Sequence, residues 1–271
     1  MRTILTNQLR LWFMITLLLC VWAPGAHSAP VAVRFVRGTV HGFVEIRSED
    51  GRVLASGDMV QVVQGGQVTM NLTFHFKDGS IDDETTVFSE RRNFQLITDH
   101  HIQKGPTFPQ PIDLLIDCRS GKVTVKSTGK DGKEDVKTTQ MHLPPDMANG
   151  LVSVIAENIL PGATGTTASM LVLTPSPRLV TLSFSSSGEG QFIVAGAPGK
   201  AIHYEMKIRL GGLVGGVASM IGKQPPNVQI WVVGGKAPTF VREQGQLYAD
   251  SPMYTIELVS PTWPDSASSG K

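Results

Sequence analysis

Residues 67–77 read QVTMNLTFHFK and alternate strictly between polar and apolar side chains. Every second residue from Val68 to Phe76 is apolar, and the residues between them are polar. Because successive side chains of a strand point to opposite faces of a sheet, this pattern predicts a strand with one buried and one solvated face. Strands of this kind are typical of antiparallel sheets.

The same alternation recurs along most of the chain and is strong from Ala201 to Leu210. Weaker alternation marks Val40–Arg47, Met59–Val63, Asn93–Ile102, Lys122–Lys126, Leu179–Phe184, Val228–Val233 and Met253–Val259. Turn sequences separate the segments, among them Asp78-Gly79, Ser120-Gly121, Gly188-Glu189-Gly190 and Pro198-Gly199. Many strands joined by tight turns predict a mainly β fold, a curved antiparallel sheet or half-open β-barrel. A long open sheet would expose its edges, which favours the curved form.

One segment departs from this pattern and predicts a helix from Asp146 to Leu160. The sequence LPPD at 143–146 provides a helix start, and Pro161-Gly162 provides a stop. Apolar residues recur between them at helical spacing, namely Met147, Leu151, Val154, Ile155 and Ile159. We expect one or two helices that cover an open end or one side of the sheet. The apolar face fits either ordinary core packing or a movable plug over a ligand cavity.

A second departure is Leu210–Gly222, which reads LGGLVGGVASMIG and carries no charge. Its glycine content disfavours a rigid helix, since each glycine costs about 1 kcal/mol in a helix. The segment fits a buried connection, or else a ligand contact or a peripheral membrane contact at the mouth of the fold.

The beginning of the chain has the order of a secretory signal peptide. Arg2 and Arg10 come first, the apolar run Leu11–Trp22 follows, and small residues precede an expected cleavage between Ser28 and Ala29. The apolar run is shorter than the roughly 20 residues that span a bilayer, although a retained anchor or a lipid on Cys20 remain alternatives. We therefore expect a signal peptide at 1–28, a single β-rich domain at 29–260, a disordered tail at 261–271, and a periplasmic or secreted location.

Charge and cysteine content narrow the class further. Cleavage removes two of the 24 basic residues and none of the 23 acidic ones, which leaves a net charge of −1. This balance does not suit nucleic acid. Cys118 then has no partner for an internal disulfide, and its place in an apolar run indicates a small buried side chain, a reactive thiol or an intermolecular bridge.

No linear motif for catalysis, a metal or a cofactor stands out, so we expect a protein without enzymatic activity. The adjacent His100 and His101 would point to opposite faces of a strand, whereas Asp99 and His101 would share one. The triplet Asp82-Asp83-Glu84 is typical of a solvated turn. A hydrolase would instead need a cleft with converging titratable groups, for which the candidates are His75, Asp99, His101 and His203.

Trp231 lies on the opposite face of its expected strand from Val228, Ile230 and Val232. An exposed tryptophan there indicates a contact site, whereas a covered one indicates a strand buried on both faces, under the helix or the tail.

The most individual stretch of the chain comprises Pro225-Pro226, Val228–Trp231 and Ala237–Arg242. With the signal peptide and the LPPD helix, it resembles a bacterial family of exported proteins of unknown function, similar to periplasmic lipoprotein carriers of the LolA/LolB type. The resemblance covers residues 35–260 as a pattern. It implies a curved antiparallel sheet, half-closed into a barrel, with helices on an apolar concave side. No functional residue of the family transfers, because no motif matches position by position.

Our hypothesis is an exported envelope protein that binds an apolar or amphipathic ligand, a lipid or a lipidated partner, between the sheet and the Asp146–Leu160 helix. The candidate lining residues are Phe74, Met147, Leu151, Ile155, Met206, Leu213 and Met220. The alternatives are a structural or partner-binding envelope protein with a packed barrel, and a secreted hydrolase of unrecognised type.

Overall fold

The computed structural model describes residues 30–129, 132–194, 197–210 and 225–260. Within them, one antiparallel sheet of 14 strands accounts for most of the chain, together with the helix α2 (Val152–Asn158). The strands are β1 (Val40–Ser48), β2 (Val53–Gln64), β3 (Gln67–Phe76), β4 (Ile81–Glu90), β5 (Phe94–Lys104), β6 (Ile112–Asp117), β7 (Lys122–Thr128), β8 (Glu134–Gln140), β9 (Thr164–Leu171), β10 (Leu179–Val194), β11 (Ala197–Leu210), β12 (Val228–Val233), β13 (Thr239–Gln246) and β14 (Met253–Val259).

The sheet is a meander whose first and last strands meet in its middle. Its order is β8-β7-β6-β5-β4-β3-β2-β1-β14-β13-β12-β11-β10-β9, so β8 and β9 form its two edges. The pairing of β1 with β14 places Ile46 opposite Ile256. The expected curved antiparallel sheet is therefore confirmed, and it is left open because β8 and β9 do not pair.

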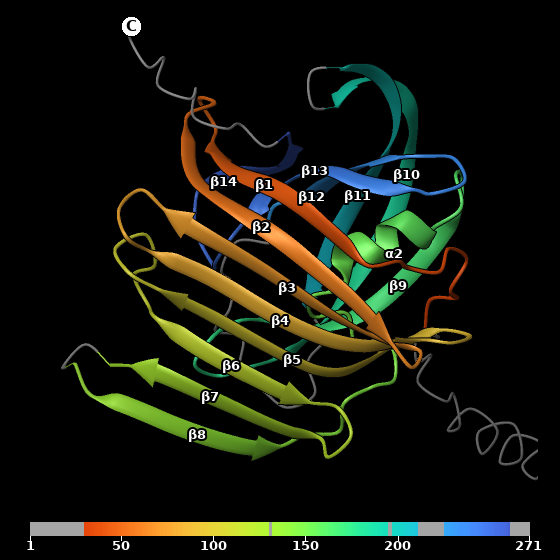
Figure 1. Cartoon of the computed structure of the whole chain (residues 1–271). Helices are drawn as coiled ribbons and strands as arrows, with labels where there is room; N and C mark the ends of the chain where they lie inside the picture. Colours follow the sequence, from red (N-terminus) through yellow and green to blue (C-terminus); the bar gives the residue numbers. More distant parts are fainter. Residues whose placement is uncertain (1–29, 130–131, 195–196, 211–224, 261–271) are drawn as a thin grey trace, which may run out of the picture.

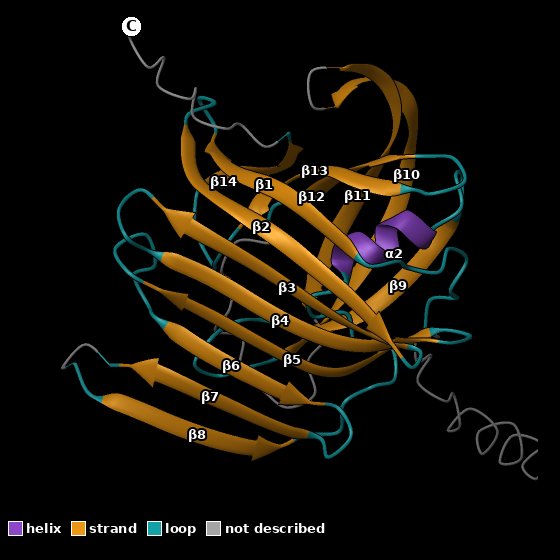
Figure 2. Cartoon of the chain, in the orientation of Figure 1, coloured by secondary structure: helices purple, strands orange, loops and turns teal. Residues whose placement is uncertain are grey.

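The sheet curls around α2, which lies in its concavity (Figures 1 and 2). Two contacts show how far the two halves approach each other. The side-chain Nε2 of Gln103 on β5 donates to the carbonyl of Leu247, just beyond β13, at 3.1 Å. The carboxyl of Glu243 on β13 lies within electrostatic range of Glu84 on β4.

Two apolar clusters fill the concave side. The larger one combines α2 with inward side chains from both halves of the sheet, such as Leu114 and Ile230, which are fully buried. The smaller one surrounds Phe74 and Phe76 near the junction of β1 and β14. Burial of this apolar surface is the main stabilising contribution to such a fold.

The strands that alternation predicts are present, with β12 and β14 at the predicted limits and β2 and β10 much longer. Three turn predictions were wrong. The triplet Asp82–Glu84 lies inside β4, and Gly188–Gly190 lies inside β10 at a bulge after Ser186. A third one, Pro198-Gly199, lies in β11.

The helix is shorter than predicted, because it begins at Val152 and not at Asp146. Gly150 has a φ of 65°, a left-handed conformation that interrupts a right-handed helix. The preceding residues instead cover the edge of β9. Ala148 N–H donates to the Ser169 carbonyl at 2.7 Å, and the Asn149 side chain exchanges two hydrogen bonds with the backbone of Leu171.

Several predictions fall outside the described residues. These are the signal peptide at 1–28, the tail at 261–271, the site candidates Leu213 and Met220, and all of Leu210–Gly222 beyond its first residue. Within the part of the chain that is described, no helix combines the length and apolar character needed to cross a membrane.

Candidate functional site

A cluster of polar side chains lies on the inner face of β4 and β5. Alternation along β4 directs Asp82, Glu84 and Thr86 inward, and the register with β5 places them opposite Gln103, His101 and Asp99. Asp82, Thr86, Asp99 and Gln103 are buried, and Glu84 and His101 are largely so. Such buried polar groups are tolerated when they bond to one another.

Hydrogen bonds connect the cluster. His101 Nε2 lies 2.6 Å from Asp82 Oδ1, and His101 Nδ1 lies 3.5 Å from Glu84 Oε1. Gln103 Nε2 donates to Asp82 Oδ2 at 2.9 Å. Thr86 Oγ1 donates to Asp99 Oδ1 at 3.0 Å, whereas Asp99 Oδ2 is buried and has no hydrogen-bond partner among the described residues.

The cluster shifts the pKa of its members. Burial lowers the pKa of His101, but the charges of Glu84 and Asp82 outweigh burial and raise this pKa to about 10. Burial, and then the charge of Glu84, raise the pKa of Glu243 to about 7. The pKa of Asp99 also rises well above its usual value, through burial and Glu84. The site therefore holds a charged imidazole together with carboxyls of weakened acidity.

Two of the four titratable residues named as candidates from the sequence lie together in this cluster. Asp99 and His101 share the inner face, as predicted, whereas His75 is exposed and His203 lies on the outer face, 2.7 Å from Gln229. Asp82 and Glu84 were missed as members of the cluster. Alternation gives no signal for them, because the apolar Ile81 and Val87 lie on the opposite face of β4. In the described part of the chain, no group of His, Cys, Asp and Glu has a metal-binding arrangement.

The end of α2 is fixed by a second buried polar network. Arg37 forms an ion pair with Glu157, whose Oε1 also accepts a hydrogen bond from Phe240 N–H at 2.7 Å. Burial lowers the pKa of Arg37 to about 10, although the charge of Glu90 opposes this. These contacts tie α2 to the N-terminal segment and to β13, so α2 is anchored at its C-terminal end.

The predicted lining residues lie in the two apolar clusters. Met147, Leu151, Ile155 and Met206 belong to the larger one and are each at most 3% exposed, whereas Phe74 belongs to the smaller one. The structure thus brings four of them together as packed side chains. Their role as ligand contacts stays a prediction.

Two pockets open elsewhere on the surface. The first has a volume of about 260 Å³ and lies where the end of α2 meets the N-terminal segment and the start of β9. The second, of about 250 Å³, lies beside Trp231 and residues 187–191 of β10. Trp231 is half-buried and stacks against His203 at 4.7 Å and Phe192 at 6.1 Å, so the β10–β11 hairpin covers it and not α2.

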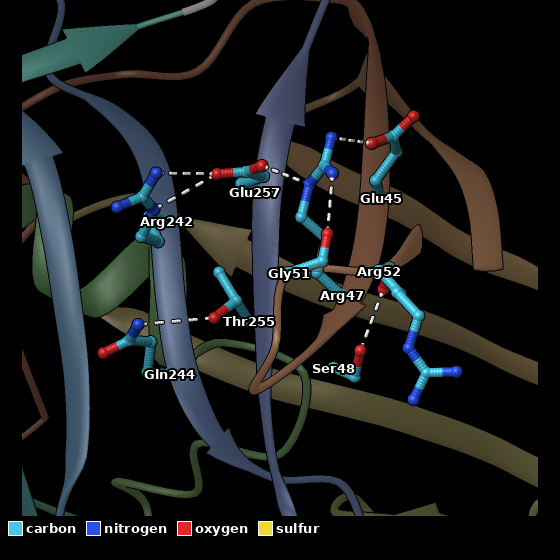
Figure 3. A network of polar contacts seen from close by, with 9 residues as sticks. All are labelled: Glu45, Arg47, Ser48, Gly51, Arg52, Arg242, Gln244, Thr255 and Glu257. Atoms are coloured by element: carbon cyan, nitrogen blue, oxygen red, sulfur yellow. Dashed lines mark hydrogen bonds and ion pairs between the residues drawn. The ribbon is translucent and has the colours of Figure 1, made fainter. Parts of the chain in front are cut away.

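The outer face carries an ion network across the seam between the first and last strands (Figure 3). Glu257 on β14 accepts hydrogen bonds from Arg242 on β13 at 2.8 Å and from Arg47 on β1 at 2.6 Å. Arg47 also pairs with Glu45 at 2.6 Å. The network supports the pairing of β1 with β14, which joins the two ends of the domain.

Comparison with known proteins gives structural neighbours of low similarity. No family model and no curated protein matches the chain. The hypothetical lipoprotein YmcC from Escherichia coli K12 aligns with a TM-score of 0.39 and 14% identity, over 83% of this chain and 86% of that one. A β-barrel-like protein from Brucella abortus, of the domain of unknown function DUF1849, aligns with a TM-score of 0.43 and 12% identity, over 84% of this chain and 100% of that one. Neither neighbour is described as a carrier of the LolA/LolB type, so that resemblance stays an expectation from the sequence.

Proposed function

We propose that this chain is an exported envelope protein that acts by binding an amphipathic ligand or a lipidated partner, without catalysis. One observation carries the proposal. The pocket of about 260 Å³ lies at the junction of α2 with the sheet, and aliphatic and polar residues both line it. Ligand sites combine apolar walls with a few polar groups in this way, although the volume falls just below the usual range of about 300–1,000 Å³.

The location differs from the one expected from the sequence. The expected cavity would lie over the apolar face of α2, where Leu151 and Ile155 are buried in the core. The pocket lies instead at the C-terminal end of the helix, beside Asn158 and Leu160. Binding there requires no displacement of α2, which is consistent with the anchoring of Glu157.

The buried interior also favours a second candidate, a structural or partner-binding envelope protein with a packed sheet. Fully buried residues from the helix and both halves of the sheet, among them Leu151, Leu114 and Leu182, form one continuous cluster. Such an interior leaves the outer surface and the edges for interactions.

Native mass spectrometry of the protein, purified from its own export pathway, separates the two candidates. A co-purifying lipid or lipidated peptide near one molecule per chain would support ligand binding, and solvent extraction would identify its class. A ligand-free mass, with no uptake of a fluorescent fatty acid, would reject ligand binding and favour the packed partner-binding protein. The N-terminal sequence of the same sample would test cleavage after Ser28.

A further inference from the structure

The pocket at the end of α2 presents one charged side chain to its occupant. Its wall is formed by Val31, Ala32 and Arg34 of the N-terminal segment, by residues 158–160, and by Ala163 and residues 165–167. None of these is acidic, and Arg34 is the single basic residue among them. A pocket of this composition has a net positive charge.

The backbone carbonyls at the end of the helix already have donors. Asn158 O accepts a hydrogen bond from Arg34 Nε at 3.0 Å, and Ile159 O accepts one from Tyr204 Oη at 2.8 Å. Leu160 O accepts one from Ala163 N–H at 2.9 Å. These carbonyls therefore do not require a ligand that donates hydrogen bonds. They also do not occupy the terminal nitrogens of Arg34, which can bind a ligand instead.

The position of Arg34 is fixed by the same helix end. Its backbone N–H donates to Asn158 Oδ1 at 2.9 Å, while its Nε holds Asn158 O. Among the described residues, no carboxylate forms an ion pair with Arg34, which is exposed. Two terminal guanidinium nitrogens in a fixed orientation suit a planar or tetrahedral anion, which they bind through paired hydrogen bonds.

An aliphatic wall lies beside this cation. Leu160 is 48% exposed, and Val31, Ile159 and Ala163 extend the apolar surface around it. An exposed leucine next to a pocket gains free energy when an alkyl chain covers it, at roughly 25 cal/mol per Å². The small volume limits the occupant to a single short chain or to one end of a longer one.

We propose that this pocket binds a single-chain anionic amphiphile, with the anionic head at Arg34 and the alkyl chain against Leu160 and Val31. This inference rests on the proposed binding function and names the site and the ligand chemistry. The pocket requires both parts of the ligand, because the exposed cation contributes modestly alone and the apolar wall is small.

The test uses isothermal titration calorimetry of the mature protein with sodium octanoate, below its micelle concentration. Octanol supplies the chain without the charge, and acetate supplies the charge without the chain. We expect octanoate to bind most tightly of the three. Arg34→Gln should lower the affinity for octanoate at least about fivefold and leave the affinity for octanol unchanged. The matched control is Arg52→Gln, which removes the same charge from the exposed β1–β2 turn, whose residues do not line the pocket.

Leu160→Ser tests the apolar wall separately, and because Leu160 is half-exposed the variant should keep the wild-type melting temperature. Leu160→Ser should lower the affinity for octanoate. Equal affinity for octanol and octanoate, or equal affinity of wild type and Arg34→Gln, would overturn this site. A co-purified lipid that octanoate does not displace would also overturn it, while the proposed binding function would stand. If no lipid co-purifies and no added lipid binds, both this site and the proposed binding function would be rejected.

Discussion

Replacing Gly150 with alanine should destabilise the protein by about 2–5 kcal/mol. At its φ of 65°, a side chain costs roughly 1–2 kcal/mol of backbone strain. A Cβ atom there would also overlap Thr86 Oγ1 and lie 2.9 Å from Asp99 Oδ1. Both atoms belong to the buried hydrogen bond between β4 and β5, so neither can move without disturbing it. Overpacking of this kind costs a further 1–3 kcal/mol or so.

Gly162→Ala is the matched control, because Gly162 has a φ of 76° and no atom lies within 4 Å of the position of its Cβ. This variant should lose only the backbone contribution of about 1–2 kcal/mol. Urea unfolding measures the free energy of unfolding of both variants, which can be compared directly if this free energy depends on urea concentration with the same slope. Equal losses for Gly150→Ala and Gly162→Ala would refute the close approach of this segment to Thr86 and Asp99.

Three further predictions test the buried networks and the sheet edge. Arg37→Met leaves Glu157 buried without its cation and should lower the free energy of unfolding in urea by about 3–5 kcal/mol. The control Arg52→Gln removes an exposed charge and should not change this free energy measurably. A small loss for Arg37→Met would show that the ion pair does not anchor α2. Because the folded state raises the pKa of Glu243 from 4.5 to about 7, the wild type should lose up to about 3 kcal/mol of stability as pH rises from 4.5 to 7. Glu243→Gln should remove this loss and be the more stable protein above pH 7, and an unchanged pH profile of the unfolding free energy would contradict the shift. Lys137→Val removes a charge from the exposed edge strand β8 and should produce oligomers in light scattering, since edge charges oppose strand pairing between molecules; a monomer at high concentration would argue against an open edge.

The strands were predictable where alternation and turn residues agree. β12 follows Pro225-Pro226 and ends before Gly234-Gly235, and it has the predicted limits. The segment Asp82–Glu84 was mistaken for a turn because three consecutive acids are polar in sequence. Inside the fold, the inward pair Asp82 and Glu84 meets His101, which compensates their charge. That compensation depends on the β4–β5 pairing and is invisible to a local pattern.

The helix and the candidate site show the same dependence on tertiary structure. The helical spacing begins at Met147, but the left-handed backbone at Gly150 keeps the helix from starting before Val152, and Met147 forms a bridge to β9 instead. The pocket combines Arg34 with Asn158, which are separated by 124 positions. The sequence predicted a cavity for an apolar or amphipathic ligand between the sheet and this helix, but it contains no signal for the contact that orients Arg34.

The open sheet itself accounts for the position of the pocket. In a closed barrel, β8 would pair with β9 and a strand would cover the whole edge of β9. Here the chain leaves β8 and returns through α2, and residues 146–149 cover the edge of β9 around Ser169 and Leu171. The pocket lies further along, at residues 165–167, between this covered part and the N-terminal segment. The pocket at Arg34 and the end of α2, where we propose the ligand site, therefore lies at an edge that the unclosed sheet leaves.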